Sequence, residues 1–351
     1  MRLIYLVSQD YARATGGWIY NERLLKELAA LGWRVTRMEL PAGFPVPDAD
    51  AMLDALATVK GLPRGALILA DQVCLSPLWF WMTTEKLKHR YAMIMHHPQV
   101  LEHSRPPDIA ARLDMNERQA LGAADCVIAT SQLTGRQMLA DYGVPTERLV
   151  VAEPGTDVFP PSPGSGGRPL HLISIGSVIP RKRHELIVEA LAGLQDFGWR
   201  LTIAGNLGLV PGHAAKLRQL ITDSGLSARV ALLGELTGAE LKALWTNADA
   251  YVAASAHEGF GMAVAEAVAR QIPVVSTYSG AVGDWLSRDA GIIVEPDDLA
   301  SLQAALARVL AEPGLRAKLQ AGAAAARQTL PTWQQTAAKI DAALRPFALG
   351  A

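Results

Sequence analysis

The chain has 351 residues, half of them hydrophobic and 19% charged, so it can bury the cores of two domains and is not a disordered protein. Its formal net charge of −1 argues against a nucleic-acid-binding protein that depends on attraction to phosphates. Cys74 and Cys126 are isolated, which indicates neither a disulfide framework nor a zinc site and fits a reducing cytoplasm.

The first apolar run, 1–7, is too short for the apolar region and cleavage site of a signal peptide, and reads as a buried strand. No run of about 18 apolar residues exists, so we expect no transmembrane helix and a cytoplasmic protein. Further apolar runs alternate with helical stretches, which predicts an α/β fold with parallel sheets and crossover helices. The expected strands of the first half are 3–7, 34–39, 66–69, 91–95, 126–130 and 149–152, and its first long helix is 19–31, ending at Gly32.

A segment dense in proline and glycine, 154–168, reads as a linker between two domains. After it the alternation restarts at His171, and the last three elements are helical. We therefore expect an N-terminal domain over 1–153, joined by a C-terminal helix at about 332–346, and a second domain over 169–331. The expected strands of the second domain are 171–175, 200–204, 230–233, 250–254, 273–276 and 291–294, and the final helices are 300–310, 313–328 and 333–344.

Two glutamates, Glu258 and Glu266, bracket a glycine-bearing turn and the start of a helix after the strand 250–254. At about 1.5 Å of rise per residue they stand up to ~12 Å apart, too far to act on one bond but suited to two grips on a long ligand. An anionic group would bind the helix N-terminus between them, and Glu266 would reach a hydroxylated group such as a ribose. A sugar nucleotide has this shape. The alternative is that both glutamates are ordinary helix carboxylates.

Four further segments follow expected strands, at the edge where open α/β sheets bind ligands. Gly176 and the basic residues Arg181, Lys182 and Arg183 suit a diphosphate clamp, although such a cluster is otherwise a solvated turn. Two glycines, 16 and 17, open the first helix, where a ligand can approach the backbone closely or where the chain merely turns. In His96-His97-Pro98, a histidine at a strand end either faces the crevice or has a structural role. Gly205-Asn206 is expected to line a pocket for the nucleotide base.

The stretch Glu258-Gly259-Phe260-Gly261, with Glu266-Ala267, Pro273-Val274-Val275 and Ser279-Gly280-Ala281, resembles the retaining GT-B glycosyltransferases of family 4, the glycosyl transferases group 1. The resemblance covers nearly the whole chain and is strongest over 170–310. It implies two Rossmann-like domains facing each other across a cleft, with the C-terminal helix crossing back to the N-terminal domain. It also implies that the second domain binds a nucleotide-sugar donor and the first presents the acceptor.

The resemblance assigns roles residue by residue. It implies that Glu258, His96 and Lys182 are catalytic, and that the donor is bound by Gly16, Gly17, Arg181, Gly205, Gly259, Phe260, Gly261 and Glu266. Ser177 stands where the family often has an arginine, so either Arg181 or Arg183 is expected to replace it.

The function implied is the transfer of a hexose from a UDP- or GDP-linked donor, UDP being favoured, to an acceptor hydroxyl with retention of configuration. No cofactor is expected, and no metal either, because no carboxylate pair is placed to carry a magnesium ion between a strand and the diphosphate. In the front-face mechanism usually inferred for such enzymes, the leaving phosphate itself accepts the proton of the acceptor. Two alternatives stay open: a nucleotide-sugar 2-epimerase of the same fold, and a non-catalytic homologue that binds nucleotide sugars.

The acceptor cannot be read from the sequence, and a small molecule, a saccharide and a lipid are all open. Its binding residues are expected on the variable loops 9–18, 41–50, 72–85 and 97–110. The aromatic segment 79–82, followed by the basic stretch 86–90, is read as core, as an acceptor-stacking surface or as a contact with the inner membrane surface.

Overall fold

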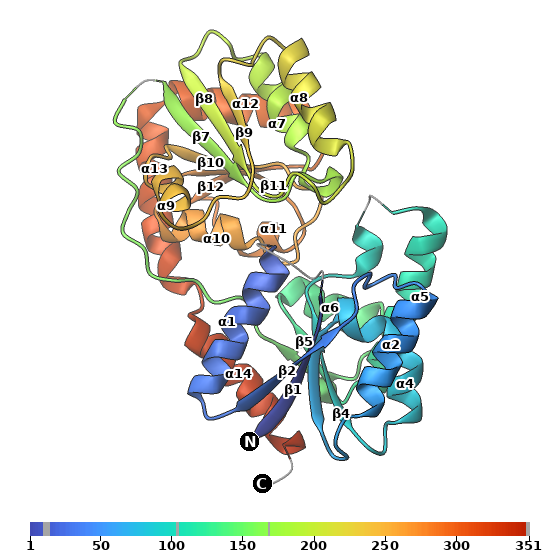
Figure 1. The fold of residues 1–351 in the computed structure, drawn as a ribbon. Helices are drawn as coiled ribbons and strands as arrows, with labels where there is room; N and C mark the ends of the chain where they lie inside the picture. Colours follow the sequence, from blue (N-terminus) through green and yellow to red (C-terminus); the bar gives the residue numbers. More distant parts are fainter. Residues whose placement is uncertain (10–14, 103–104, 168, 349–351) are drawn as a thin grey trace. The chain divides into compact units, whose positions relative to one another are not determined.

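The computed structural model describes residues 1–9, 15–102, 105–167 and 169–348, so residues 10–14 of the first expected acceptor loop and 103–104 of the last lie outside it. The chain divides into two compact units, Met1–Gly155 with Pro331–Ala351, and Thr156–Leu330 (Figure 1). Most of the segment expected as a linker belongs to the second unit. Ser162 Oγ donates to the carbonyl oxygen of Trp245 (3.0 Å), and Ser165 Oγ donates to Asp249 Oδ2 (2.6 Å).

The first unit contains a six-stranded parallel sheet in the order β2-β1-β3-β4-β5-β6. Its strands are β1 (Arg2–Ser8), β2 (Arg34–Leu40), β3 (Leu67–Asp71), β4 (Arg90–Met95), β5 (Cys126–Ala129) and β6 (Leu149–Val151). Its helices are α1 (Gly16–Ala30), α2 (Ala49–Lys60), α3 (Gln72–Leu75), α4 (Trp79–Thr84), α5 (Pro107–Ala123), α6 (Gln132–Ala140) and α14 (Trp333–Leu344).

The second unit contains a six-stranded parallel sheet in the order β12-β11-β10-β7-β8-β9. Its strands are β7 (Leu170–Ile175), β8 (Trp199–Ala204), β9 (Val230–Leu233), β10 (Ala250–Ala253), β11 (Val274–Thr277) and β12 (Gly291–Val294). Its helices are α7 (His184–Ala192), α8 (His213–Asp223), α9 (Gly238–Thr246), α10 (Met262–Ala269), α11 (Ala281–Trp285), α12 (Leu299–Ala311) and α13 (Pro313–Ala326).

The α/β fold expected from the sequence is confirmed, and every expected strand is present. The first helix begins earlier than expected, at Gly16, because Thr15 caps it: its Oγ1 accepts from the backbone N–H of Trp18. The segment 72–85, expected to be an acceptor loop, is largely helical and contains α3 and α4. Within it Trp81 and Met82 are buried in the core, whereas Phe80 is 65% exposed.

The strand orders locate the ligand-binding edges. The second sheet has the dinucleotide-binding order, in which the chain reverses direction across the sheet between β7 and β10. The first sheet has the other common doubly wound order, with its reversal between β1 and β3. At such a point the loops after two neighbouring strands diverge to opposite faces and leave room for a ligand at the carboxyl ends.

The C-terminal helix α14 belongs to the first unit, as the resemblance implied. Its Thr332 forms a capping box with Gln335, which satisfies two of the free N–H groups at the helix start. The Trp333 ring lies edge-on to Tyr20, with ring centroids 5.9 Å apart. At the other end, Trp33 Nε1 donates to Asp341 Oδ1 (2.8 Å). The helix is thereby held at both ends.

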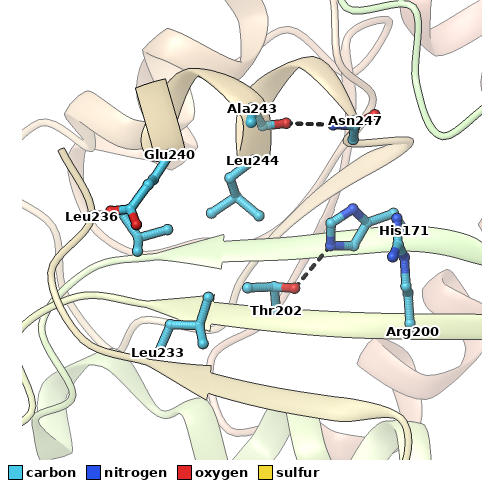
Figure 2. Close-up of a pocket in the computed structure, with 9 residues that line it drawn as sticks. All are labelled: His171, Arg200, Thr202, Leu233, Leu236, Glu240, Ala243, Leu244 and Asn247. Atoms are coloured by element: carbon cyan, nitrogen blue, oxygen red, sulfur yellow. Dashed lines mark hydrogen bonds between the residues drawn. The ribbon is translucent and has the colours of Figure 1, made fainter. Parts of the chain in front are cut away.

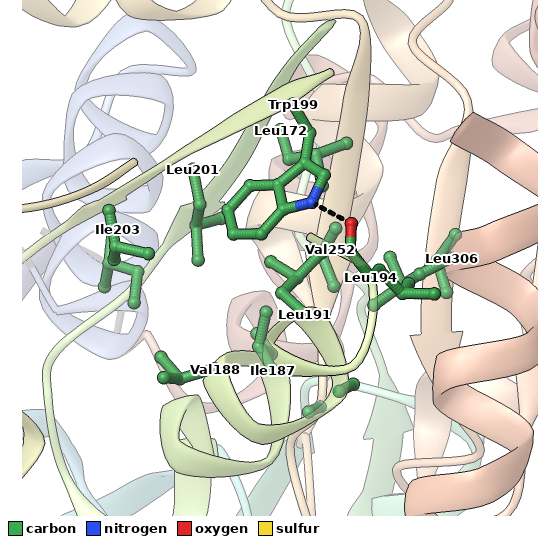
Figure 3. Packing of buried hydrophobic residues seen from close by; sticks show 14 of the residues in the cluster. Leu172, Ile187, Val188, Leu191, Leu194, Trp199, Leu201, Ile203, Val252 and Leu306 are labelled. Atoms are coloured by element: carbon green, nitrogen blue, oxygen red, sulfur yellow. Dashed lines mark hydrogen bonds between the residues drawn. The ribbon is translucent and has the colours of Figure 1, made fainter. Parts of the chain in front are cut away.

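Two apolar clusters hold the second unit together, one on each face of its sheet. Helices α7, α8 and α12 pack on one face, and α9, α10 and α11 on the other (Figure 1). In the first cluster, the Trp199 indole lies among aliphatic side chains from several strands and helices, and its N–H donates to the Leu194 carbonyl at 2.7 Å (Figure 3). A buried indole N–H thus keeps a hydrogen-bond partner.

Among the described residues, no helix is long and apolar enough to span a membrane.

Gly155→Ala is expected to destabilise the protein by about 1–3 kcal/mol, because the added methyl carbon would lie 2.2 Å from the backbone nitrogen of Trp333. Gly122→Ala is the matched control: its Cβ meets nothing within 4 Å, and alanine in the helix α5 is favoured over glycine by roughly 0.5–1 kcal/mol. Urea unfolding followed by circular dichroism should therefore show opposite shifts. A Gly155→Ala midpoint equal to that of the unmodified protein would contradict the packing of α14.

Leu201→Ala removes a fully buried side chain beside Trp199 and should cost about 2–5 kcal/mol of unfolding free energy. Leu209→Ala, at a position that is 47% exposed in the same unit, should leave thermal unfolding nearly unchanged. Differential scanning calorimetry of the intact chain measures both variants. Equal melting profiles for the two would show that this cluster does not carry the stability of the second unit.

Candidate functional site

The loops after β7 and β10 meet at the reversal point of the second sheet. Lys182 lies in the loop after β7, and Glu258 lies in the turn that follows β10. Lys182 Nζ is 2.6 Å from Glu258 Oε1, which also accepts a 2.6 Å hydrogen bond from Ser255 Oγ. Glu258 is only 8% exposed, so a carboxylate largely removed from water is neutralised by a lysine 76 positions away.

Arg181, not Arg183, is the second cation of this cluster. Its Nη1 donates to the carbonyl oxygen of His257 (2.7 Å) and lies 3.6 Å from Glu258 Oε2. Arg183 has a left-handed backbone, with φ of 51°, and its guanidinium pairs with Asp297 in an exposed position. Of the two arginines that the sequence left open as a replacement at Ser177, the structure brings only Arg181 to Glu258.

The charges of the cluster fix the state of Glu258. Burial alone would raise the pKa of its carboxyl, but Lys182, Arg181 and the Ser255 hydroxyl outweigh that effect and lower it to about 2. The carboxylate is therefore ionised at neutral pH. With two cations and one anion, the cluster carries a net positive charge, which suits an anionic ligand.

The loop after β11 holds the backbone of Glu258 in place. The Glu258 N–H donates to the Ser279 carbonyl (3.0 Å), and the Ala281 N–H donates to the Glu258 carbonyl (3.2 Å). Gly280, between them, has φ of +65°, and a Cβ there would lie 2.9 Å from the His257 ring. In the sequence, Ser279-Gly280-Ala281 carries part of the family resemblance but gives no sign that this loop fixes Glu258, because backbone hydrogen bonds leave little signature in side-chain type.

Glu266 lies in the second turn of α10, and Arg270 holds its carboxylate. Arg270 Nη2 and Nε donate to Glu266 Oε1 at 2.8 and 3.1 Å. Burial raises the pKa of Glu266, while the hydrogen bond and charge of Arg270 act in the opposite direction. Arg270 did not appear among the expected site residues.

The expected donor-binding glycines have structural roles in the second unit. A Cβ on Gly205, with φ of +153°, would lie 2.1 Å from the Gly176 carbonyl oxygen, so the loops after β7 and β8 pack backbone to backbone there. Gly261 has φ of +91° and begins α10, and a Cβ there would meet Val282 at 2.4 Å. Both positions require glycine for packing, whatever else they bind.

Two other expected donor-binding residues lie between Glu258 and α10. Phe260 is buried, and its ring stacks on Trp285 with centroids 5.3 Å apart. Trp285 Nε1 also donates to the Phe260 carbonyl (2.7 Å). The buried Phe260 side chain therefore holds the turn against Trp285. The half-buried Gly259 leaves the backbone of the turn accessible.

In the first unit, His96 follows β4 and packs edge-on against Tyr20, with ring centroids 5.4 Å apart. Burial, with a smaller effect from His97, lowers the pKa of His96 to about 3, so its imidazole is neutral. Its Nε2 is buried and forms no hydrogen bond among the described residues. Gln72 holds the adjoining backbone, accepting from the His96 N–H (3.3 Å) and donating to the His97 carbonyl (3.3 Å).

Gly16 and Gly17 lie in the first turn of α1, the helix that follows β1 of the first sheet. Their N–H groups belong to the end of the helix where backbone donors lack intrahelical partners. A buried pair that the sequence did not single out lies at the end of β3, where Asn21 Nδ2 donates to Asp71 Oδ2 (3.0 Å). A polar pair at this reversal point fits the position of a ligand edge.

A separate hollow of about 330 Å³ lies beneath α9 in the second unit (Figure 2). His171 and Thr202, whose side chains are hydrogen-bonded at 2.8 Å, lie on the strands below the helix. None of the expected site residues lines it. Among the described residues, no group of three or more His, Cys, Asp or Glu side chains is placed to hold a metal ion.

Residues 157–326, nearly all of the second unit, match the sequence model of the family described as glycosyl transferases group 1. A D-inositol 3-phosphate glycosyltransferase of Kineococcus radiotolerans is 29% identical over 249 residues, which cover 63% of this chain and 57% of that protein. One from a Nocardioides species is 30% identical over 274 residues, covering 68% and 59%. The chain thus spans a little over half the length of the curated relatives it matches.

Solved structures share the fold across almost the whole chain. Sucrose-phosphate synthase from Thermosynechococcus elongatus superposes with a TM-score of 0.81 at 21% identity, over 98% of both chains. Anabaena HepE, in complex with UDP-glucose, does so with a TM-score of 0.77 at 18% identity, over 98% of this chain and 100% of that one. The chain has the GT-B fold, and its second unit, over residues 157–326, belongs to the glycosyl transferases group 1.

Proposed function

We propose that the protein is a retaining glycosyltransferase of family 4 that moves a hexose from a nucleotide-diphosphate sugar, with UDP as the favoured nucleotide, to an acceptor hydroxyl. The observation that carries the proposal is the buried cluster of Lys182, Arg181 and Glu258 at the reversal point of the second sheet, within the part of the chain that matches the family. The complex of Anabaena HepE with UDP-glucose supports the choice of nucleotide.

The cations of the cluster would bind the diphosphate. The Lys182 ammonium has three N–H donors and gives one to Glu258, so two remain for phosphate oxygens without breaking the ion pair. Free N–H groups at the start of α10 add donors for an anion. As the bond to the sugar breaks, negative charge grows on the leaving diphosphate, and positive groups already fixed in place stabilise that charge most effectively.

Glu258 would bind the transferred sugar. Its Oε1 is occupied by Lys182 and Ser255, and its Oε2 lies 3.6 Å from Arg181, leaving that oxygen able to accept from a sugar hydroxyl. Because the carboxylate is ionised, it also stabilises positive charge that develops on the sugar ring. Glu266 would accept from the ribose hydroxyls, and the neutral His96 of the first unit would contact a sugar hydroxyl.

The proposed reaction needs no metal ion, since Lys182, Arg181 and backbone N–H groups take the role of balancing the phosphate charge. The acceptor is unassigned. Because the relatives from Kineococcus radiotolerans and Nocardioides are named for D-inositol 3-phosphate, that compound is the first acceptor to assay.

One class of nucleotide sugar, among the UDP-, GDP- and ADP-linked compounds, should raise the melting temperature of the protein without added metal. A ligand at 100 times its Kd stabilises the folded state by about 2.7 kcal/mol. Lys182→Ala should lose most of this shift because a phosphate donor is gone. Lys216→Ala, an exposed lysine on α8, is the matched control and should keep it. The donor site is misassigned if none of the compounds shifts the protein, or if Lys182→Ala shifts as the unmodified protein does.

Glu258→Gln keeps the shape of the side chain but removes its charge, and should lower the rate of sugar transfer by about 100-fold or more while donor binding persists. Release of nucleotide diphosphate, measured with and without D-inositol 3-phosphate, gives the rate. Glu240→Gln, at an exposed position of α9, should not change it.

The same assay separates the alternatives. Wild-type turnover in Glu258→Gln would show that the site is wrong. Donor binding without release of nucleotide under any condition would indicate a non-catalytic homologue, and conversion of the donor to its 2-epimer without acceptor would indicate an epimerase.

A further inference from the structure

Arg270 is fixed by three segments of the second unit. It ends α10, and its side chain is only 10% exposed. The guanidinium lies 3.7 Å from the centre of the Phe159 ring and 5.3 Å from that of Trp245. Its own backbone carbonyl accepts from the N–H of Ser162 (2.8 Å). Stacking on two aromatic rings, together with this backbone bond, leaves the guanidinium little freedom to turn.

This fixed guanidinium contacts only one oxygen of Glu266. Both Nε and Nη2 donate to Oε1, so the two lone pairs of that oxygen are already used. No hydrogen bond to Oε2 is found among the described residues. The side chain of Glu266 keeps 29% of its surface exposed, so a ligand can reach the carboxylate that Arg270 holds from behind.

Burial leaves the pKa of Glu266 above its usual value, and Arg270 opposes protonation of the carboxylate. Burial raises the pKa of Glu266, and the nearby Asp157 raises it further, whereas Arg270 lowers it through its hydrogen bond and its charge. An ionised carboxylate only accepts hydrogen bonds, through the lone pairs of both oxygens. A protonated carboxyl group carries an O–H donor on one oxygen and so accepts fewer hydrogen bonds from hydroxyl groups. The cation therefore favours the form that can accept from a diol.

We propose that Arg270 is a positioning residue for the donor: it locks Glu266 Oε1 so that Oε2 is presented to the two adjacent hydroxyls of the nucleotide ribose. This inference rests on the proposed function, because it takes Glu266 as the group that binds the ribose. Arg270 itself does not touch the ligand. Phe159 and Trp245 take part by holding the guanidinium plane.

The test compares a nucleotide with its counterpart lacking the ribose hydroxyls. The intact protein is titrated calorimetrically with UDP, GDP and ADP, and the tightest binder is then compared with its 2′,3′-dideoxy form. The unmodified protein should prefer the ribonucleotide by about tenfold or more, because hydrogen bonds to a charged group are strong. Arg270→Gln should reduce this preference to about threefold or less by weakening the ribonucleotide alone.

Two further variants sharpen the result. Arg270→Lys keeps the charge but loses the two-pronged donor and the planar stacking, and should give an intermediate preference. Arg308→Gln removes an exposed arginine that also pairs with a glutamate four residues away, and should leave the preference unchanged. The preference is a ratio of two dissociation constants, so it does not depend on what fraction of a variant is folded.

Each outcome is decisive. Loss of the ribose preference in Arg270→Gln, with the dideoxy nucleotide bound as before, supports the proposal. Equal weakening of both nucleotides, with the preference retained, would show that Arg270 only stabilises the fold and would overturn it. If the unmodified protein binds none of the three nucleotides, the proposed function fails and this inference fails with it. If it binds one without any ribose preference, only the inference fails.

Discussion

The second unit depends on one constraint: a carboxylate that is almost removed from water must be neutralised. Glu258 meets it through Lys182 and Arg181, which come from the loop after the neighbouring strand. A buried charge without a partner costs several kcal/mol, so the two loops cannot separate without a large loss of stability. The strands β7 and β10 are adjacent because the strand order of the sheet reverses there, and this adjacency brings Lys182 and Glu258 together. The ion pair in turn holds the two loops together at the edge of the sheet.

Much of the fold could be predicted from the sequence, because buried parallel strands are short apolar runs that stand out between polar helices. The contact between Lys182 and Glu258 could be expected only through the family resemblance, because neither segment by itself indicates the order of the strands that brings them together. The choice between Arg181 and Arg183 could not be made at all. It depends on a left-handed backbone at Arg183, which turns that side chain towards Asp297.

The features that sequence reasoning missed share a physical cause. The loop at Ser279 and Gly280 acts through its backbone, and any small residues with a suitable turn would look similar in the sequence. Arg270 follows Glu266 at the ordinary spacing of a solvated helix ion pair, which contributes little when exposed. Only the structure shows that it is buried against Phe159, whose segment the sequence assigned to a linker.

The two glutamates are neutralised in different ways, and the difference matches the charges of the proposed ligand. Around Glu258, two cations face one anion, and Lys182 retains N–H donors for a ligand, so this end of the site is positive. Around Glu266, the one cation, Arg270, is paired with the carboxylate and packed against aromatic rings, and Asp157 lies nearby, so this end carries no free positive charge. A diphosphate is anionic and a ribose is neutral. In the proposed site, one positive end and one end without free positive charge would therefore favour one orientation of a sugar nucleotide before any base-specific contact is made.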